Sequence, residues 1–452
     1  MLESLDGIIS LINSYLWGVP MLVLLLGTHI YLTVRLRFPQ RHIFTAIKLS
    51  VTKDSGSVGD VSQFSALATS LAGTIGTGNI IGVATAITMG GPGAVFWCWV
   101  TGVFGIATKY AEGLLAIKYR VKTEDGKMLG GPMYAIERGM KSKWLAVFFA
   151  AMTAITAFFI GNTIQCNSIS TVLSKTYGID TVWTGVAISA LTLAVVVFGV
   201  KGISKVCERL VPFMAIFYVL GCVVILCINH AYVLPALGLI VKSAFTAKAA
   251  AGGFTGSAVM IAMRYGIARG LFSNESGLGS APVVAAAAQT RNPVRQALVS
   301  STSPFWDTVV ICAITGIMLV SSILANPDVD PSAGAVLSEL AFAQIPYVGT
   351  ILLSVGIVTF AFSTILGWSY VGEKALEYLM GQKARLIYRI LWVMATFFGS
   401  VTAINLVWNL GDLTNALMAI PNIICLLALS GVVVSETRKY LWSGRLDDES
   451  DE

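Results

Sequence analysis

Charged residues are scarce in this sequence. Only 12% of its 452 residues are Asp, Glu, Lys or Arg, whereas 56% are hydrophobic. A soluble domain carries about 25% charged residues, so the composition excludes a soluble enzyme. The 30 Lys and Arg exceed the 24 Asp and Glu by a formal net charge of +6, which is too small and too scattered for a nucleic-acid-binding surface. We expect an integral membrane protein without a nucleic-acid partner.

Paired cysteines and clustered histidines are also missing. The seven Cys are isolated and the three His lie far apart in the sequence, which argues against a disulfide framework, a thiolate metal site or a metalloprotease motif. No P-loop motif is present, so an ATP-driven pump is not expected. No nucleophile-elbow motif is present either. We therefore expect neither an enzyme nor a resident cofactor.

Long apolar stretches dominate the chain instead. A helix needs about 20 apolar residues to cross a bilayer, and the sequence offers about eleven candidates. We therefore expect an all-α integral membrane protein with about eleven transmembrane helices. The expected spans cover residues 16–34, 62–90, 94–119, 144–174, 182–200, 210–228, 254–288, 296–322, 347–371, 388–410 and 413–434.

Basic residues lie mainly in alternate connections between these spans. With the N-terminus outside, 24 of the 30 Lys and Arg fall on the inner side. The connection before the ninth span, on the outer side, is acidic instead. By the positive-inside rule, we expect an external N-terminus and a cytoplasmic C-terminus.

Two of the spans are interrupted by glycine and polar residues. The second span contains Gly-Thr-Ile-Gly-Thr-Gly-Asn at residues 73–79, and the seventh contains Gly-Leu-Phe-Ser-Asn-Glu-Ser-Gly-Leu-Gly at residues 270–279. Each Gly costs about 1 kcal/mol relative to Ala in a helix, so we expect both helices to unwind there. An unwound backbone in a bilayer must be buried in protein or line a cavity. Glycines that only allow close helix packing are the alternative interpretation.

The two interrupted spans occupy corresponding places in the chain. They are the first and sixth of the last ten spans, so they cross the membrane in opposite directions. This pattern is typical of transporters built from two inverted five-helix repeats with discontinuous helices. We expect an extra N-terminal helix and a cytoplasmic connection in residues 1–60, the first repeat in 61–230, an external connection and the second repeat in 231–435, and a cytoplasmic tail in 436–452.

Three stretches resemble the signature motifs of the alanine/glycine:cation symporter family. They are AGTIGTGNIIG at residues 72–82, GGPGAVFW at 90–97 and RGLFSNESGLGSAP at 269–282, and the resemblance extends over nearly the whole chain. It implies an inverted-repeat core of the leucine-transporter type in a prokaryotic plasma membrane, and sodium-coupled symport of alanine and glycine. Na⁺ is then the coupling ion, membrane lipid surrounds the protein, and no obligatory protein partner is expected. A proton-coupled symporter and a channel are the alternatives.

A zwitterionic amino acid needs N–H donors for its carboxylate and acceptors for its ammonium group. Unwinding at residues 73–79 frees backbone N–H groups at the start of a half-helix, where the helix dipole also favours an anion. Gly78 lets the carboxylate approach the backbone because it has no Cβ. Helix packing is the alternative role for the long amide and the aromatic side chains. We expect the carboxylate at Thr77, Gly78 and Asn79, the ammonium at Gln165, Ser273 and Asn274, and a size-limiting wall of Phe272 and Trp368.

Carbonyl groups freed at Ala72 and Ile75 suit a hard cation, which prefers oxygen ligands. By resemblance to the leucine-transporter fold, the hydroxyl pair Ser363 and Thr364 on the eighth core helix completes a sodium site there. Hydrogen bonds back to their own helix are the alternative role for this pair. The same resemblance makes Asn79 a second sodium candidate.

Glu275 is the acid that lies deepest in an expected span. Carboxylates inside membranes are rare and usually functional, so Glu275 is the proton carrier of the proton-coupled alternative. We favour a structural or gating role, with Arg269, six residues earlier, as the candidate ion-pair partner. Lys109 and Glu112, one helical turn apart, predict a local salt bridge.

Overall fold

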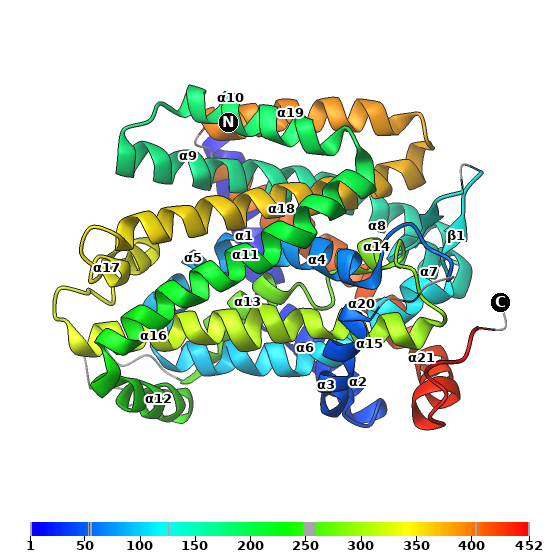
Figure 1. Cartoon of the computed structure of the whole chain (residues 1–452), viewed down its shortest axis with the longest axis horizontal. Coiled ribbons are helices and arrows are strands. Elements are labelled where there is room, and N and C mark those ends of the chain that lie inside the picture. Colours follow the sequence, from blue (N-terminus) through cyan, green and yellow to red (C-terminus); the bar gives the residue numbers. More distant parts are fainter. Residues whose placement is uncertain are drawn as a thin grey trace.

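The computed structural model describes residues 2–52, 54, 57–124, 126–246, 259–402 and 405–450. Within these residues the protein is a bundle of long helices, many of which run side by side (Figure 1). The one sheet in this described part is a two-stranded antiparallel hairpin of β1 (Val121–Lys122) and β2 (Met128–Leu129). The expected all-helical architecture is confirmed.

Each expected span corresponds to a helix or to a broken pair of helices. Among the described residues, seven helices are long and apolar enough to cross a membrane, or up to nine if each bent pair is one span. The helices at the expected spans are α2 (Val19–Arg35), α4 (Gln63–Thr74) with α5 (Ile81–Gly90), α6 (Gly93–Lys118), α8 (Lys143–Thr156) continuing through the π-helical η3 (Ala157–Thr163) into α9 (Ile164–Tyr177), α10 (Thr181–Val196), α11 (Gly199–Ile228), α13 (Val259–Asn274) with α14 (Ala281–Ala285), α15 (Pro293–Pro304) continuing through the π-helical η4 (Phe305–Cys312) into α16 (Ala313–Ala325), α18 (Gly349–Met380), α19 (Ala384–Val401) and α20 (Asn405–Ala428).

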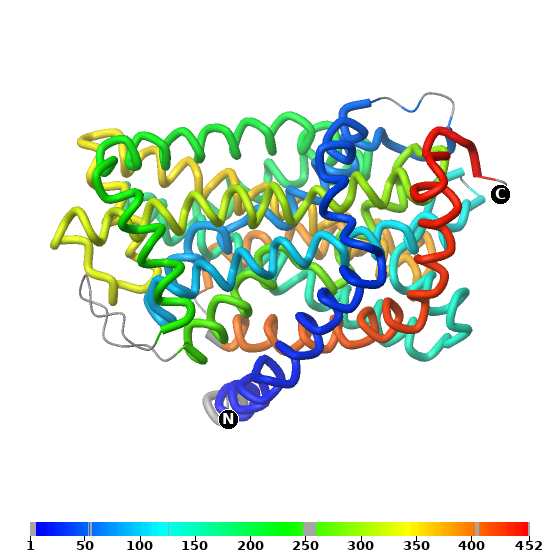
Figure 2. Tube along the Cα trace, turned by 90° about the horizontal axis from the view of Figure 1, so that it is seen from below, coloured from blue at the N-terminus to red at the C-terminus, as the bar shows by residue number. Residues whose placement is uncertain are grey.

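Several shorter helices lie at the two ends of the bundle or protrude from it. One end carries α12 and α17, and the other carries β1, α7 and the C-terminal residues (Figure 1); these are called the α17 end and the β1 end below. Helix α1 protrudes from the bundle at the N-terminus (Figure 2). The shorter helices are α1 (Leu2–Leu16), η1 (Pro39–His42), α3 (Ile43–Val51), α7 (Pro132–Gly139), α12 (His230–Phe245), η5 (Gly334–Val336), α17 (Leu337–Phe342), α21 (Ser430–Thr437) and η6 (Arg438–Trp442).

Some expected boundaries are wrong. Helix α11 begins at Gly199, well before the expected start of its span at residue 210, because the basic residues of this stretch continue the helix with their heads exposed. Helix α19 ends at Val401 and α20 begins at Asn405, whereas the sequence predicts a boundary near residue 411. The expected start of the seventh span at Phe254 lies outside the described residues.

The first interrupted helix breaks inside the expected stretch. Ser62 starts α4 by accepting a hydrogen bond from the N–H of Ser65 at 3.1 Å, which satisfies a donor that the first helical turn leaves free. The helix ends at Thr74, and Ile75 and Gly76 are extended. A 3₁₀ turn, η2 (Thr77–Asn79), then leads into α5, and the two halves are bent by 62°.

The second interrupted helix breaks later than the glycine pattern predicts. Residues 270–274 still belong to α13, and the break begins at Glu275, which has a positive φ of 52°. Gly277 and Gly279 follow with φ of 90° and 88°, values that suit glycine because it has no Cβ. Helix α4 packs against α11 and α18, while α13 packs against α6, so both breaks lie inside the bundle.

Candidate functional site

The two helix breaks are tied together by a buried asparagine. The Nδ2 of Asn79 donates to the Oγ of Ser273 at 3.1 Å and to the Oδ1 of Asp307 at 2.7 Å. Ser273 itself donates to the Oδ2 of Asp307 at 2.8 Å. On its other side, the Oδ1 of Asn79 accepts from the N–H of Gly76 at 2.9 Å. Asp307, on the π-helical η4, therefore connects the first break to the second.

A small chamber lies between the breaks. Its volume is about 20 Å³, which is room for about one water molecule. The Oγ1 of Thr77 lies 3.2 Å from the Oε1 of Gln165, so the structure brings together the first break and the long amide of α9. Five of the expected substrate residues line the chamber, namely Thr77, Gly78, Gln165, Phe272 and Ser273, together with Glu275 and Thr364.

The start of η2 offers two backbone donors to this chamber. The N–H of Asn79 donates to the carbonyl of Gly76 at 3.2 Å, so this third amide is bonded within the turn, and its expected use for a carboxylate stays a prediction. The N–H groups of Thr77 and Gly78 come before that first bond of the turn, at its positive end. Both residues line the chamber.

Two expected substrate residues lie behind the chamber, not on its surface. Asn274 faces α6: its Nδ2 donates to the Oγ1 of Thr101 at 3.5 Å, and its Oδ1 accepts from the N–H of Ser276 at 3.0 Å. The ring of Trp368 packs near Gly73, where an added Cβ would lie 3.7 Å from it. In the described part of the chain, neither Asn274 nor Trp368 is among the residues that line the chamber.

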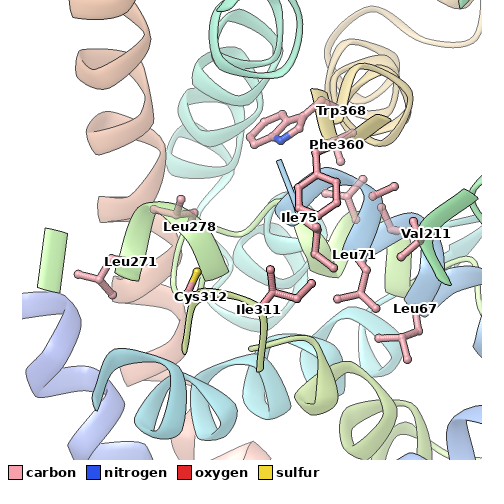
Figure 3. Packing of buried hydrophobic residues seen from close by; sticks show 14 of the residues in the cluster. Leu67, Leu71, Ile75, Val211, Leu271, Leu278, Ile311, Cys312, Phe360 and Trp368 are labelled. Atoms are coloured by element: carbon pink, nitrogen blue, oxygen red, sulfur yellow. The ribbon is translucent and has the colours of Figure 1, made fainter. Parts of the chain in front are cut away.

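The four expected sodium ligands come together beside the first break. The Oγ of Ser363 lies 3.2 Å from the carbonyl oxygen of Ala72 and 3.4 Å from that of Ile75. Thr364 is adjacent, because a Cβ added to Gly76 would lie 2.7 Å from its Oγ1. Both hydroxyls also bond back to the carbonyl of Phe360 in their own helix, at 2.8 and 3.0 Å. Figure 3 shows Ile75 close to Phe360 of α18, with Trp368 of the same helix further away.

A wide vestibule leads from the α17 end to the chamber. Its volume is about 410 Å³, and Thr77, Gly78 and Phe272 line both spaces. Arg269 and Glu339 place charges of opposite sign along its wall. Thr77, Gly78 and Phe272 therefore form the boundary between the chamber and the vestibule, and the Phe272 ring, which a Cβ on Gly78 would approach to 3.3 Å, is the largest side chain there.

Contacts between helices close the bundle between the chamber and the β1 end. Val61, just before α4, and Ala288, just after α14, form a parallel backbone bridge, and Arg120 donates to the carbonyl of Ala288 at 2.9 Å. Nearby, Arg291 forms an ion pair with the buried Asp54 at 2.7 Å. The described residues therefore form a bundle that is open toward the α17 end and sealed at the β1 end.

Glu275 has partners other than the expected one. Its carboxylate accepts hydrogen bonds from the Nε1 of Trp368 at 3.2 Å and from the Oγ of Ser280. Arg269 lies on the vestibule wall and interacts electrostatically with Asp412. The expected pairing of Glu275 with Arg269 is wrong, because Glu275 bonds to Trp368 and Ser280 instead and, with its φ of 52°, lies beyond the end of α13, the helix that carries Arg269.

The expected salt bridge between Lys109 and Glu112 is present, at 3.8 Å, and is buried. It extends to the second break, because the Nζ of Lys109 donates to the carbonyl of Glu275 at 3.1 Å. The Oε1 of Glu112 accepts from the N–H of Gly277 at 3.1 Å and from the Nδ2 of Asn422 at 2.7 Å. Side chains of α6 and α20 thus hold the unwound segment by its backbone.

Removing the ammonium group of Lys109 should destabilise the protein strongly. Breaking a buried ion pair leaves an uncompensated charge and costs about 3–5 kcal/mol, so Lys109→Met should lower the melting temperature in detergent markedly. Lys143→Met is the matched control, because its ion pair with Glu137 is solvent-exposed and such pairs contribute about 0–1 kcal/mol. Equal melting temperatures for the two variants would contradict a structural role for the buried pair.

Asp307 is not among the site residues that the sequence predicted. The signal was present, because an acid in an apolar span is functional by default, but the residues that it bonds come from two other helices. Asn422 gave no such signal, since uncharged amides are common in membrane helices that pack together.

Comparisons with known proteins agree with this architecture. A model described as the sodium:alanine symporter family matches residues 2–451. The chain is 50% identical over 442 residues to the sodium/alanine symporter AgcS of Methanococcus maripaludis, covering 96% of this chain and 97% of the relative. It is 35% identical over 447 residues to a Bacillus subtilis protein named "Probable sodium/glutamine symporter GlnT", covering 97% and 91% respectively.

A solved structure shares the fold at low sequence identity. The crystal structure of MhsT in complex with L-phenylalanine matches with a TM-score of 0.61 at 14% identity, covering 86% of this chain and 96% of MhsT. This likeness supports the expected leucine-transporter-type fold. The chain is a membrane transporter and not an enzyme, and it belongs to the sodium:alanine symporter family.

Proposed function

We propose that the protein couples the movement of Na⁺ to the symport of alanine and glycine by alternating access. The observation that carries this proposal is the meeting of the Ala72 and Ile75 carbonyls with the Ser363 hydroxyl, at 3.2 and 3.4 Å. A hard cation prefers such oxygen ligands. In the described residues no cluster of three or more His, Cys, Asp or Glu offers another metal site.

The substrate carboxylate binds the N–H groups of Thr77 and Gly78, and the ammonium group faces Gln165 and Ser273. Thr77, Gly78, Gln165 and Ser273 all line the chamber, and the positive end of η2 favours an anion. The chamber of about 20 Å³ must widen to admit even alanine. Phe272 is the side chain that moves, because it separates the chamber from the vestibule.

Shortening Phe272 should broaden substrate selection. In Phe272→Ala, leucine should compete for the alanine site at least about tenfold better than in wild type, since each extra methylene accommodated is worth about 1–3 kcal/mol. Competition against labelled alanine measures this, and Phe213→Ala is the control because Phe213 lies 56% exposed on the outer face of α11. If Phe272→Ala still rejects leucine as wild type does, another side chain, such as that of Trp368, limits the size of the substrate.

The chain crosses the membrane eleven times in this proposal, with the N-terminus outside and the C-terminus in the cytoplasm of a prokaryotic cell. Each broken helix is then the first core helix of one of two inverted five-helix repeats, which occupy residues 61–230 and 231–435. An extra helix within residues 1–60 precedes them, and a tail at 436–452 follows. The excess of Lys and Arg on one side supports this orientation. The vestibule at the α17 end accordingly faces outward.

Proton coupling is the competing mechanism, because Glu275 and Asp307 are buried carboxylates beside the chamber. Asn79, the second sodium candidate, bonds to Asp307, so the same pair also serves the sodium mechanism. Uptake of labelled alanine into proteoliposomes decides between them. A sodium gradient alone should drive uptake; uptake driven by a pH gradient in potassium without sodium would instead support the proton mechanism.

A further inference from the structure

An apolar groove lies on the outside of the bundle, next to the first helix break. Side chains from α3, α4, α11 and η4 line it, and its volume is about 490 Å³. Leu67 and Leu71 of α4 and Ile75, directly after its end, supply one wall, while Val211 and Ile311 belong to α11 and η4 (Figure 3). Pockets that hold small organic molecules measure about 300–1,000 Å³, so the groove is large enough for a ligand.

The groove opens toward the hydrocarbon of the membrane. Ile216 and Leu220, which line it, are 61% and 58% exposed. They belong to α11, whose most apolar window has a mean hydropathy of 2.7 and is only 33% buried inside the protein. The hydroxyl of Ser50, the one hydroxyl among the described lining residues, donates to the carbonyl of Ile47 at 2.7 Å. The groove therefore offers its ligand hydrocarbon contacts and no hydroxyl donor.

Basic side chains flank the groove on the side of the β1 end. Lys48 of α3 and Arg209 of α11 are exposed and lie on the same helix faces as the lining residues Val51 and Pro212, each one turn further along. Glu208, the acid beside Arg209, already accepts a hydrogen bond from Ser65 at 2.9 Å. In the proposed orientation this end meets the cytoplasmic leaflet, where Lys and Arg attract anionic headgroups.

We propose that the groove binds a hydrocarbon chain of an anionic phospholipid, with the headgroup at Lys48 and Arg209. The bound chain packs against α4, the half-helix that supplies the Ala72 and Ile75 carbonyls. If the groove were empty, α4 would lose the dispersion contacts that the hydrocarbon chain makes with it. The bound lipid therefore stabilises the position of α4 in which the carbonyls face Ser363. This consequence rests on the proposed sodium site, whereas the binding of lipid does not.

Lipid retention by the purified full-length protein tests the site directly. Native mass spectrometry should find phosphatidylglycerol retained in preference to phosphatidylcholine. Ala215→Trp places an indole in the groove and should lower phosphatidylglycerol retention about tenfold. Val224→Trp is the matched control, because Val224 is 45% exposed on the same helix and is not a lining residue.

A second variant tests the contact between the lipid headgroup and the two basic side chains. Lys48→Gln with Arg209→Gln should lower phosphatidylglycerol retention at least about tenfold and leave phosphatidylcholine retention unchanged. Both side chains are exposed, so this variant keeps its fold and the test does not depend on Ala215→Trp alone. Removing two exposed charges elsewhere, in Lys122→Gln with Lys383→Gln, controls for net charge.

Two results would overturn the proposal. Equal retention of phosphatidylglycerol by Ala215→Trp and Val224→Trp would show that the hydrocarbon chain does not bind in the groove. Equal retention of phosphatidylglycerol and phosphatidylcholine by wild type would show that the headgroup is not recognised. In proteoliposomes, added phosphatidylglycerol should raise sodium-driven alanine uptake by wild type and not by the doubly substituted protein. Retention without any sodium-driven uptake would overturn the proposed function and leave the lipid site standing.

Discussion

Replacing Gly78 by valine should abolish high-affinity alanine binding without unfolding the protein. The new Cβ would lie 3.3 Å from the ring of Phe272, and its methyl groups would occupy the space in which the carboxylate meets the N–H groups of Thr77 and Gly78. Overpacking of this kind costs about 1–3 kcal/mol, and the lost carboxylate contacts add to it. Alanine affinity should therefore fall at least about 100-fold.

Gly82→Val is the matched control for this substitution. Gly82 lies one turn further along, in α5, and a Cβ added there would meet nothing within 4 Å. Binding of labelled alanine to the purified proteins at saturating sodium gives the comparison, and thermal unfolding checks that both variants are folded. Wild-type affinity in Gly78→Val would show that the carboxylate binds away from η2.

The first break could be predicted from the sequence because its cause is local. Three glycines within residues 73–78 remove helix propensity, and the helix indeed ends at Thr74. The carbonyl candidates for sodium, Ala72 and Ile75, followed from the same break, since the last carbonyls of a half-helix have no helical partner, whereas Ser363 and Thr364 came from the family resemblance. What the sequence could not supply is the rotation of α18 that turns Ser363 toward those carbonyls.

The second break begins later than the sequence predicts, because Gly270, the first glycine of the stretch, allows close helix packing and does not end the helix. A Cβ on Gly270 would lie 2.0 Å from the Oγ1 of Thr101 and 3.1 Å from the Cα of Cys98. Gly270 is therefore a packing glycine, which lets α13 approach α6 closely, and it remains helical. Composition cannot distinguish this from unwinding, because the contact is made by a helix some 170 positions earlier in the chain.

Partners of buried charges were the least predictable part of the site. Spacing of three residues predicted the ion pair of Lys109 with Glu112, because such residues face each other on a helix. Asp307 bonds to Asn79 and Ser273, residues of two different helices, so its role follows only from the arrangement of the bundle. Burying a polar side chain without a hydrogen bond costs free energy, but the sequence does not say where its partner lies.

Removing the hydroxyl of Ser363 should weaken sodium binding far more than alanine binding. A hydrogen bond or ligand contact to a charged group contributes about 1.5–3 kcal/mol, so Ser363→Ala should raise the half-saturating sodium concentration about 10- to 100-fold. Thr364→Ala should act in the same direction. Ser354→Ala is the control, because Ser354 lies on the same helix and donates only to the carbonyl of Thr350, at 2.8 Å.

Coupling between the two ligands makes this experiment decisive. If sodium raises the affinity for alanine, alanine must raise the affinity for sodium by the same factor, so alanine binding in Ser363→Ala should be weak at low sodium and recover fully at high sodium. A substitution that damaged the chamber itself would lower alanine affinity at every sodium concentration. Alanine binding should therefore be titrated at several sodium concentrations in wild type, Ser363→Ala and Ser354→Ala. A sodium dependence identical in all three would remove Ser363 from the ion site, and alanine binding indifferent to sodium in wild type would leave Glu275 and Asp307 as the groups that couple transport to protons.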